Sequence, residues 1–249
     1  MKKVLILASL FLSFAGIARA DETISIKVGY QMLKPSGTFA GNIAGVGTHA
    51  DVKNDLGLKN SNQPTGEVAL QFGDSRLSLG FIPMDFKGTG TLARTITFNG
   101  QNFTAGTTVN SQLKGDIYDI AYTYYLINMD DLPSRFQLGI EGAVKVVKAK
   151  ASMTSAAQTQ SVSATVGIPT IGLRARVALA DFIGLVGRVG YLGYSGNHFL
   201  DADAQVEFSP LPMVGIYGGY RYLQVKVDQS GLFVDTKFQG PYIGGLVRF

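Results

Sequence analysis

An alternation of apolar and polar side chains with a period of two runs through this chain and constrains its fold more than any other feature. Near the N-terminal end, Ile24, Ile26 and Val28 alternate with polar residues, and the segment 200–208 places Leu, Ala, Val or Phe at every even position. A period of two is typical of β-strands with two chemically different faces. After the N-terminal segment, no stretch approaches the 18 consecutive apolar residues of a spanning helix. We therefore predict an all-β protein.

Ten segments with this alternation are separated by turn-forming residues. They cover residues 23–33, 64–72, 76–90, 108–126, 135–150, 161–179, 183–194, 199–208, 213–227 and 232–249. Strands that follow one another at short spacing pair as antiparallel neighbours. The pattern predicts an antiparallel up-and-down sheet of ten strands. Eight strands, with two hairpins confined to loops, is the alternative.

The connections between these segments are of two kinds that alternate along the chain. Residues 73–75, 130–133, 180–181 and 209–212 form tight turns, whereas residues 34–63, 91–107 and 151–160 form longer connections rich in Gly, Thr, Asn and Ser. Short turns at one end and long loops at the other are typical of transmembrane β-barrels in bacterial outer membranes. In a bilayer every backbone polar group needs a partner, so such a sheet has to close into a barrel.

Residues 1–20 have the features of a cleaved secretory signal peptide. Lys2 and Lys3 precede an apolar run, and Ala18-Arg19-Ala20 ends the segment with small residues where a signal peptidase cuts. We expect residues 21–249 to form one barrel domain. The chain has 22 Lys and Arg against 18 Asp and Glu, and three of the basic residues lie in residues 1–20, so the remainder has a net charge of +1. This charge does not favour nucleic-acid binding.

Aromatic residues gather near both ends of the predicted strands. Phe72, Tyr124, Phe136, Phe182, Phe208 and Phe249 lie near the short turns, and Tyr30, Phe86, Tyr118, Tyr191, Tyr194 and Tyr222 lie toward the other end. Two bands of aromatic rings are typical of the two interfaces of a bilayer.

The last ten residues, Gly240-Pro-Tyr-Ile-Gly-Gly-Leu-Val-Arg-Phe249, resemble the final strand of bacterial outer-membrane β-barrel proteins, in particular the small porin-like and OmpA-like barrels. Phe249 ends the chain, and Val247 and Ile243 place apolar residues at alternate positions before it. The segment 51–58 also resembles a pattern of small barrels in this class. The resemblance implies location in the outer membrane, contact with its lipid, and recognition of Ile243, Val247 and Phe249 by the barrel-insertion machinery.

If the apolar face of each strand meets lipid, the opposite face lines the barrel interior. It carries Lys27, Gln71, Asp119, Glu141, Lys145, Arg174, Arg176, Arg188, Asp201, Asp203, Glu207, Arg221 and Arg248. Neighbouring strands have opposite charges, which favours ion pairs across them. We expect Glu141 and Lys145 to face Arg174 and Arg176, and the acidic segment 201–207 to face Arg188 and Arg221.

This interior has two possible roles. Eight strands give a lumen that side chains just fill, and ten strands lie close to that size. We therefore expect a non-enzymatic outer-membrane protein that is structural or offers a narrow passive channel for small solutes. The long segment 34–63 contains several apolar residues, and we expect it to form a lid over the barrel mouth, a surface that binds a ligand or partner, or a mobile surface loop.

Catalysis is the remaining alternative. His198 lies near Asp201, Asp203 and Ser195 in the sequence, a combination that a hydrolase at the barrel rim would use as base, orienting carboxylate and nucleophile. A loop histidine is more often merely solvated, and Asp201 and Asp203 already have expected ion-pair partners. The chain has two histidines and no cysteine, and no metal-ligand spacing. We expect no catalytic residues, metal or cofactor.

Overall fold

The computed structural model describes residues 24–41, 50–129, 135–211, 213–229 and 232–249. Its elements are strands, and no described helix is long and apolar enough to cross a membrane. The strands are β1 (Ile24–Gly41), β2 (Ala50–Asp51), β3 (Ser61–Phe72), β4 (Ser75–Thr91), β5 (Ile96–Phe98), β6 (Gln101–Phe103), β7 (Thr108–Met129), β8 (Phe136–Thr154), β9 (Thr159–Ala180), β10 (Ile183–Tyr194), β11 (Asn197–Phe208), β12 (Val214–Gln229) and β13 (Leu232–Arg248).

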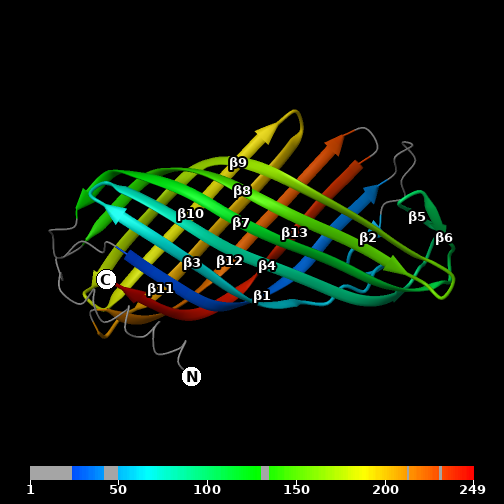
Figure 1. Cartoon of the computed structure of the whole chain (residues 1–249), viewed down its shortest axis with the longest axis horizontal. Helices are drawn as coiled ribbons and strands as arrows, with labels where there is room; N and C mark the ends of the chain where they lie inside the picture. The colour runs from blue at the N-terminus through cyan, green and yellow to red at the C-terminus, as the bar shows by residue number, and fades with distance from the viewer. Residues whose placement is uncertain (1–23, 42–49, 130–134, 212, 230–231) are drawn as a thin grey trace, which may run out of the picture.

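Ten long strands form one closed antiparallel barrel (Figure 1). Each strand pairs with the next in the order β1, β3, β4, β7 to β13, and β13 pairs back with β1 from Ser25↔Arg248 to Gly41↔Leu232. Phe249 adds backbone hydrogen bonds in both directions with Ile24, at 2.9 and 3.1 Å. Closure removes every free edge in the membrane, as lipid requires. The ten-strand prediction is confirmed, and the eight-strand alternative is wrong.

The strands are longer at the loop end than the alternation predicted. β1 continues to Gly41, β8 and β9 continue to a turn at 155–158, and the segment 91–107 contains the small hairpin β5–β6. The short turns and the C-terminus lie at the opposite end, the left of Figure 1. The expected signal peptide and the turn at 130–133 lie outside the described residues.

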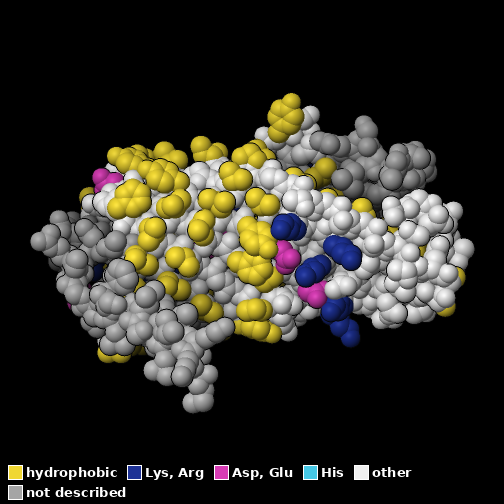
Figure 2. Space-filling model, viewed as in Figure 1, with side chains coloured by type: hydrophobic (Ala, Val, Ile, Leu, Met, Phe, Trp, Pro, Cys, Tyr) yellow, Lys and Arg dark blue, Asp and Glu magenta, His cyan; other side chains and the backbone are white. Residues whose placement is uncertain are grey.

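A belt of exposed apolar side chains surrounds the half of the barrel near the short turns, which we call the short-turn half (Figure 2). Strand β7 contributes Tyr118, Ile120, Tyr122 and Tyr124, each more than a third exposed. Other members of the belt are Val28, Tyr30, Val68, Leu70, Phe72, Leu79, Phe81, Ile140, Val144, Ile171, Leu173, Val189, Tyr191, Val206, Phe208, Ile216, Tyr220 and Ile243. A closed belt of this kind is the lipid-facing surface of an outer-membrane barrel.

Above the belt the polarity of the barrel wall is reversed. On the outer face of β7, Tyr118 is followed toward the loop end by Asp116 and Lys114, whereas on its inner face the buried Asp119 is followed by the buried Ile117. The reversal recurs on β8, where outward Val146 gives way to outward Lys148. Water therefore surrounds the half near the loops, the loop half, and its interior is apolar.

Candidate functional site in the barrel lumen

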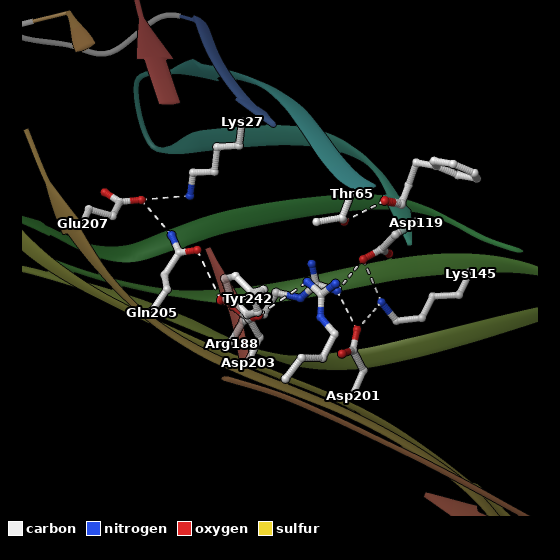
Figure 3. Close-up of polar contacts among 12 residues, drawn as sticks. Lys27, Thr65, Asp119, Lys145, Arg188, Asp201, Asp203, Gln205, Glu207 and Tyr242 are labelled. Atoms are coloured by element: carbon white, nitrogen blue, oxygen red, sulfur yellow. Dashed lines mark hydrogen bonds and ion pairs between the residues drawn. The ribbon is translucent and has the colours of Figure 1, made fainter. Parts of the chain in front are cut away.

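The interior of the short-turn half contains a network of ion pairs centred on Arg188 and Lys145. Arg188 of β10 binds Glu141 of β8 through Nε at 3.0 Å and Asp201 of β11 through Nη2 at 2.8 Å, and also contacts Asp119 of β7 (Figure 3). Lys145 Nζ lies 2.8 Å from Asp119 Oδ2 and 2.6 Å from Asp201 Oδ2. All five side chains are buried. Two cations and three carboxylates, supplied together by four strands, thus form one network across the lumen.

A second network lies nearer the short turns and is centred on Glu207 of β11. Lys27 Nζ lies 2.8 Å from Glu207 Oε1, Arg176 lies 3.7 Å from Oε2, and Arg248 of the last strand contacts the same carboxylate. Gln205 Nε2 donates a hydrogen bond to Glu207 at 2.7 Å. Because Lys27 and Arg248 belong to the first and last long strands, this network also ties together the closing seam of the barrel.

Several expected lumen charges have partners other than those predicted. Arg188 and Arg221 do pair with the acidic strand, the latter with Asp203 at 3.4 Å. Glu141 and Lys145 do not lie directly opposite Arg174 and Arg176 in the sheet, so this part of the expectation is wrong, but the Glu141 carboxylate still attracts the Arg174 guanidinium. In the β8–β9 ladder Arg174 lies opposite Gly139 and Arg176 opposite Gln137, while Glu141 and Lys145 reach across the lumen.

All twelve charged residues that were assigned to the interior nevertheless lie on the inner face of the short-turn half. One further ion pair was not predicted, between Arg76 Nη2 and Glu67 Oε1 at 2.8 Å. Glu67 follows the same alternation as Gln71, which was assigned to the interior. The alternation therefore contained the information needed to find it.

These side chains leave little open space. A cavity of about 50 Å³ lies between the networks and is lined by Glu67, Asp119, Arg174, Arg188 and Arg221, with Tyr217 and Tyr242 at its side. Such a volume holds a few water molecules and no larger solute. Arg221 lies over the Tyr242 ring, 5.5 Å from its centroid, which narrows the lumen further.

The interior of the loop half is an apolar core. Phe86 stacks on Phe238 with ring centroids 5.1 Å apart, and Ile117, Phe199 and Leu223 pack in the same cluster. Val52, Leu56 and Leu58 of the segment 50–58 are almost fully buried in it, together with residues of β5 and β6. Phe86 therefore does not belong to an aromatic band, contrary to prediction.

The segment 34–63 is not a surface loop in its described part. Residues 34–41 belong to β1, residues 61–63 belong to β3, and residues 50–58 lie inside the barrel mouth. The apolar side chains Val52, Leu56 and Leu58 are buried as a lid would require, so they do not form a binding surface themselves. Lys53 and Asn54 are exposed, and residues 42–49 lie outside the described residues, so binding by this segment stays a prediction.

His198 does not meet the carboxylates expected beside it. Its ring stacks on Tyr191 on the outer side of the wall, with centroids 6.3 Å apart, whereas Asp201 is buried in the lumen network. Residues separated by an odd number of positions point to opposite faces of a strand. The constellation of His198 with Asp201 or Asp203 is therefore not formed. The described residues contain no group of three or more potential ligands that could hold a metal ion.

No protein-family model matches this chain, and no curated protein sequence matches it. Among solved structures, the outer membrane protease OmpT from Escherichia coli has a TM-score of 0.59 at 11% identity, covering 94% of this chain and 99% of that one. The attachment invasion locus protein Ail of Yersinia pestis has a TM-score of 0.41 at 13% identity, covering 92% and 100%. The likeness to OmpT shows that the chain has the fold of the bacterial outer-membrane β-barrels.

Proposed function

We propose that this protein is a non-enzymatic outer-membrane barrel with a closed lumen, which anchors a rigid β-structure on the outer side of the membrane. The observation that carries the proposal is the double filling of the lumen. Ion-pair networks fill the short-turn half, and an apolar core containing residues 50–58 fills the loop half. A structural role is favoured over the alternative of a narrow passive channel.

A solute on its way through the lumen would meet two different barriers. In the short-turn half it would have to displace Arg188 or Lys145 from buried carboxylates, and unpairing such charges costs several kcal/mol. In the loop half it would have to separate side chains such as Phe86 and Phe238, and an ion would lose its hydration there. Both barriers favour a closed barrel.

Conductance in a planar bilayer tests this proposal. We expect the refolded protein to show no steady single-channel openings, while a known porin in the same bilayer conducts. Heat-modifiable gel migration establishes that the silent protein is folded. Reproducible openings of the folded wild-type chain would contradict the closed lumen and would direct attention to the cavity beside Arg221 and Arg174.

A second candidate function is the binding of an extended peptide by strand addition, and an edge of β9 favours it. The ladder between β9 and β10 ends at Tyr191↔Ile171, so among the described strands residues 159–170 of β9 pair with β8 alone. No charged residue occurs from 151 to 173. Proteins usually protect a long edge with charges, prolines or bulges. Pro169 lies close to the end of the shared ladder, whereas residues 159–168 contain neither a charge nor a proline, and such an edge is a template for strand addition.

A further inference from the structure

A cluster of lysines lies on the outer surface just above the lipid-facing belt (Figure 2). The cluster consists of Lys87 on β4, Lys114 on β7, and Lys148 and Lys150 on β8, and we call it the lysine patch. All four side chains are exposed. In Figure 2 basic and acidic side chains gather at the border where the apolar belt ends. The patch therefore meets the region where lipid headgroups lie.

Two of these lysines are direct neighbours of the same sign. Lys114 of β7 lies opposite Lys150 of β8 in the ladder, and both project outward. Like charges at directly opposed positions of a sheet destabilise it. A bound anion between the two ammonium groups would remove this repulsion, so the two lysines are more stable side by side with an anion bound than in water alone.

Lys148 sets the height of the patch relative to the membrane. Its ammonium lies 5.1 Å from the centroid of the Tyr118 ring, and Tyr118 packs against Phe81 with centroids also 5.1 Å apart. These two aromatic residues form the upper border of the belt. Lys150 follows two residues later, roughly 7 Å further along the strand. The ammonium groups are thus close enough to the hydrocarbon border to contact lipid headgroups.

The remaining polar groups of this surface leave the patch with a positive charge. Asp85 lies 3.2 Å from Lys87, and Asp116 lies 3.9 Å from Lys114, so two carboxylates oppose four lysines. On the neighbouring β9, Ser163 lies opposite Lys150 and Thr165 opposite Lys148. These residues add hydroxyl donors beside Lys150 and beside Lys148, which has Asp116 opposite it on β7.

We propose that the lysine patch binds the phosphate groups of lipopolysaccharide, the phosphorylated glycolipid of the outer leaflet. Lysine ammonium groups bind phosphate as compact point charges, and neighbouring hydroxyls add hydrogen bonds. Basic side chains close to a membrane border are attracted to anionic headgroups. The site is independent of the lumen and of whether the barrel conducts.

The test compares two triple variants that remove the same charge from the outer face of the barrel. One carries Lys114→Gln, Lys148→Gln and Lys150→Gln. The control carries Lys34→Gln, Lys226→Gln and Lys237→Gln, three outward lysines on β1, β12 and β13, of which none lies opposite another in the ladders. Purified lipopolysaccharide is titrated into each refolded protein in a phosphate-free, uncharged detergent, and the shift in unfolding temperature is followed by gel migration.

We expect lipopolysaccharide to stabilise the wild type and the control variant alike. The patch variant should need at least about tenfold more lipopolysaccharide for the same shift, and the wild-type shift should decrease as salt is added. An unchanged response of the patch variant, or an equal loss in the control, would overturn the proposal. So would equal stabilisation by dephosphorylated lipopolysaccharide or by inorganic phosphate at the same concentration. If the triple variant does not fold, Lys150→Gln alone, against Lys226→Gln, provides the same comparison.

Discussion

At the scale of single residues, Lys145 shows how the lumen stabilises the barrel. Its side chain has no exposed surface and lies between the carboxylates of Asp119 and Asp201. Burying an ammonium group is unfavourable unless it is paired. The two carboxylates are equally buried and need cations in turn. Each charge in the network is therefore tolerated because of its neighbours.

Lys145→Met should destabilise the barrel by about 3–5 kcal/mol, since it leaves buried carboxylates with less compensation. The control is Lys226→Met on the outer surface of β12, which should change the free energy of unfolding by less than about 1 kcal/mol. Urea unfolding in lipid vesicles, followed by gel migration because the chain has no Trp, measures both. Equal losses in the two variants would mean that the ion pairs of Lys145 contribute nothing of their own.

At the scale of elements, β9 extends well past the end of its neighbour β10. β9 has 22 residues and β10 has 12, so the loop-side part of β9 extends past the end of the shared ladder. Pro169 lies two residues beyond the last pair and has no N–H for a further ladder bond. Near the loop-side end of β9, Asn99 Nδ2 donates a hydrogen bond to the Ser161 carbonyl at 3.3 Å. Residues 162–170 therefore form the free part of the edge.

Amide hydrogen exchange should reveal this edge directly. In residues 162–168, amides that face β8 should be protected, and the alternate amides that face the open edge should exchange at least about tenfold faster, because only paired amides are shielded. Residues 171–177, which pair on both sides, serve as the control within the same strand. Uniform protection from 162 to 168 would mean that the edge is covered and would remove the support for strand addition.

At the scale of the whole molecule, the reversal of polarity along the wall divides one barrel into two environments. The outer face is apolar in the short-turn half and polar in the loop half, and the inner face has the opposite order. Each half satisfies the hydrophobic effect, because apolar side chains meet lipid in one half and each other in the other half. This arrangement holds the barrel at a defined depth in the membrane.

Two arginine substitutions on the same face of β7 test that depth. Ile120→Arg places a charge in the belt and should cost more than about 1 kcal/mol, but less than the roughly 2–4 kcal/mol of an arginine at mid-bilayer, because Tyr118 at the border lies only two residues away. Asn110→Arg, on the same outer face in the loop half, should cost less than about 1 kcal/mol because water surrounds it. The free energy of unfolding in lipid vesicles distinguishes the two sites. Equal costs would show that the belt does not end near Tyr118.

The fold was largely predictable from the sequence, and the details of the site were not. The alternation located all ten long strands, and it placed charges such as Arg188 and Asp201 on the inner face. It failed at the loop half, where the same alternation continues but the apolar side chains point inward. The alternation shows which residues share a face of a strand, but it does not show whether lipid, water or protein covers that face.

The sequence alone therefore predicted ten antiparallel strands, with eight left open as the alternative, because strand positions depend on local periodicity and turn residues. The closing role of the last strand followed from its resemblance to the final strand of outer-membrane barrels. Only the tertiary structure decided which charges pair, where the wall reverses its polarity, and that residues 50–58 lie inside the mouth. These features depend on contacts between distant strands, such as Glu141 of β8 with Arg188 of β10 and Lys27 of β1 with Glu207 of β11. Such contacts follow from the tilt and stagger with which the sheet closes, and no local pattern encodes them.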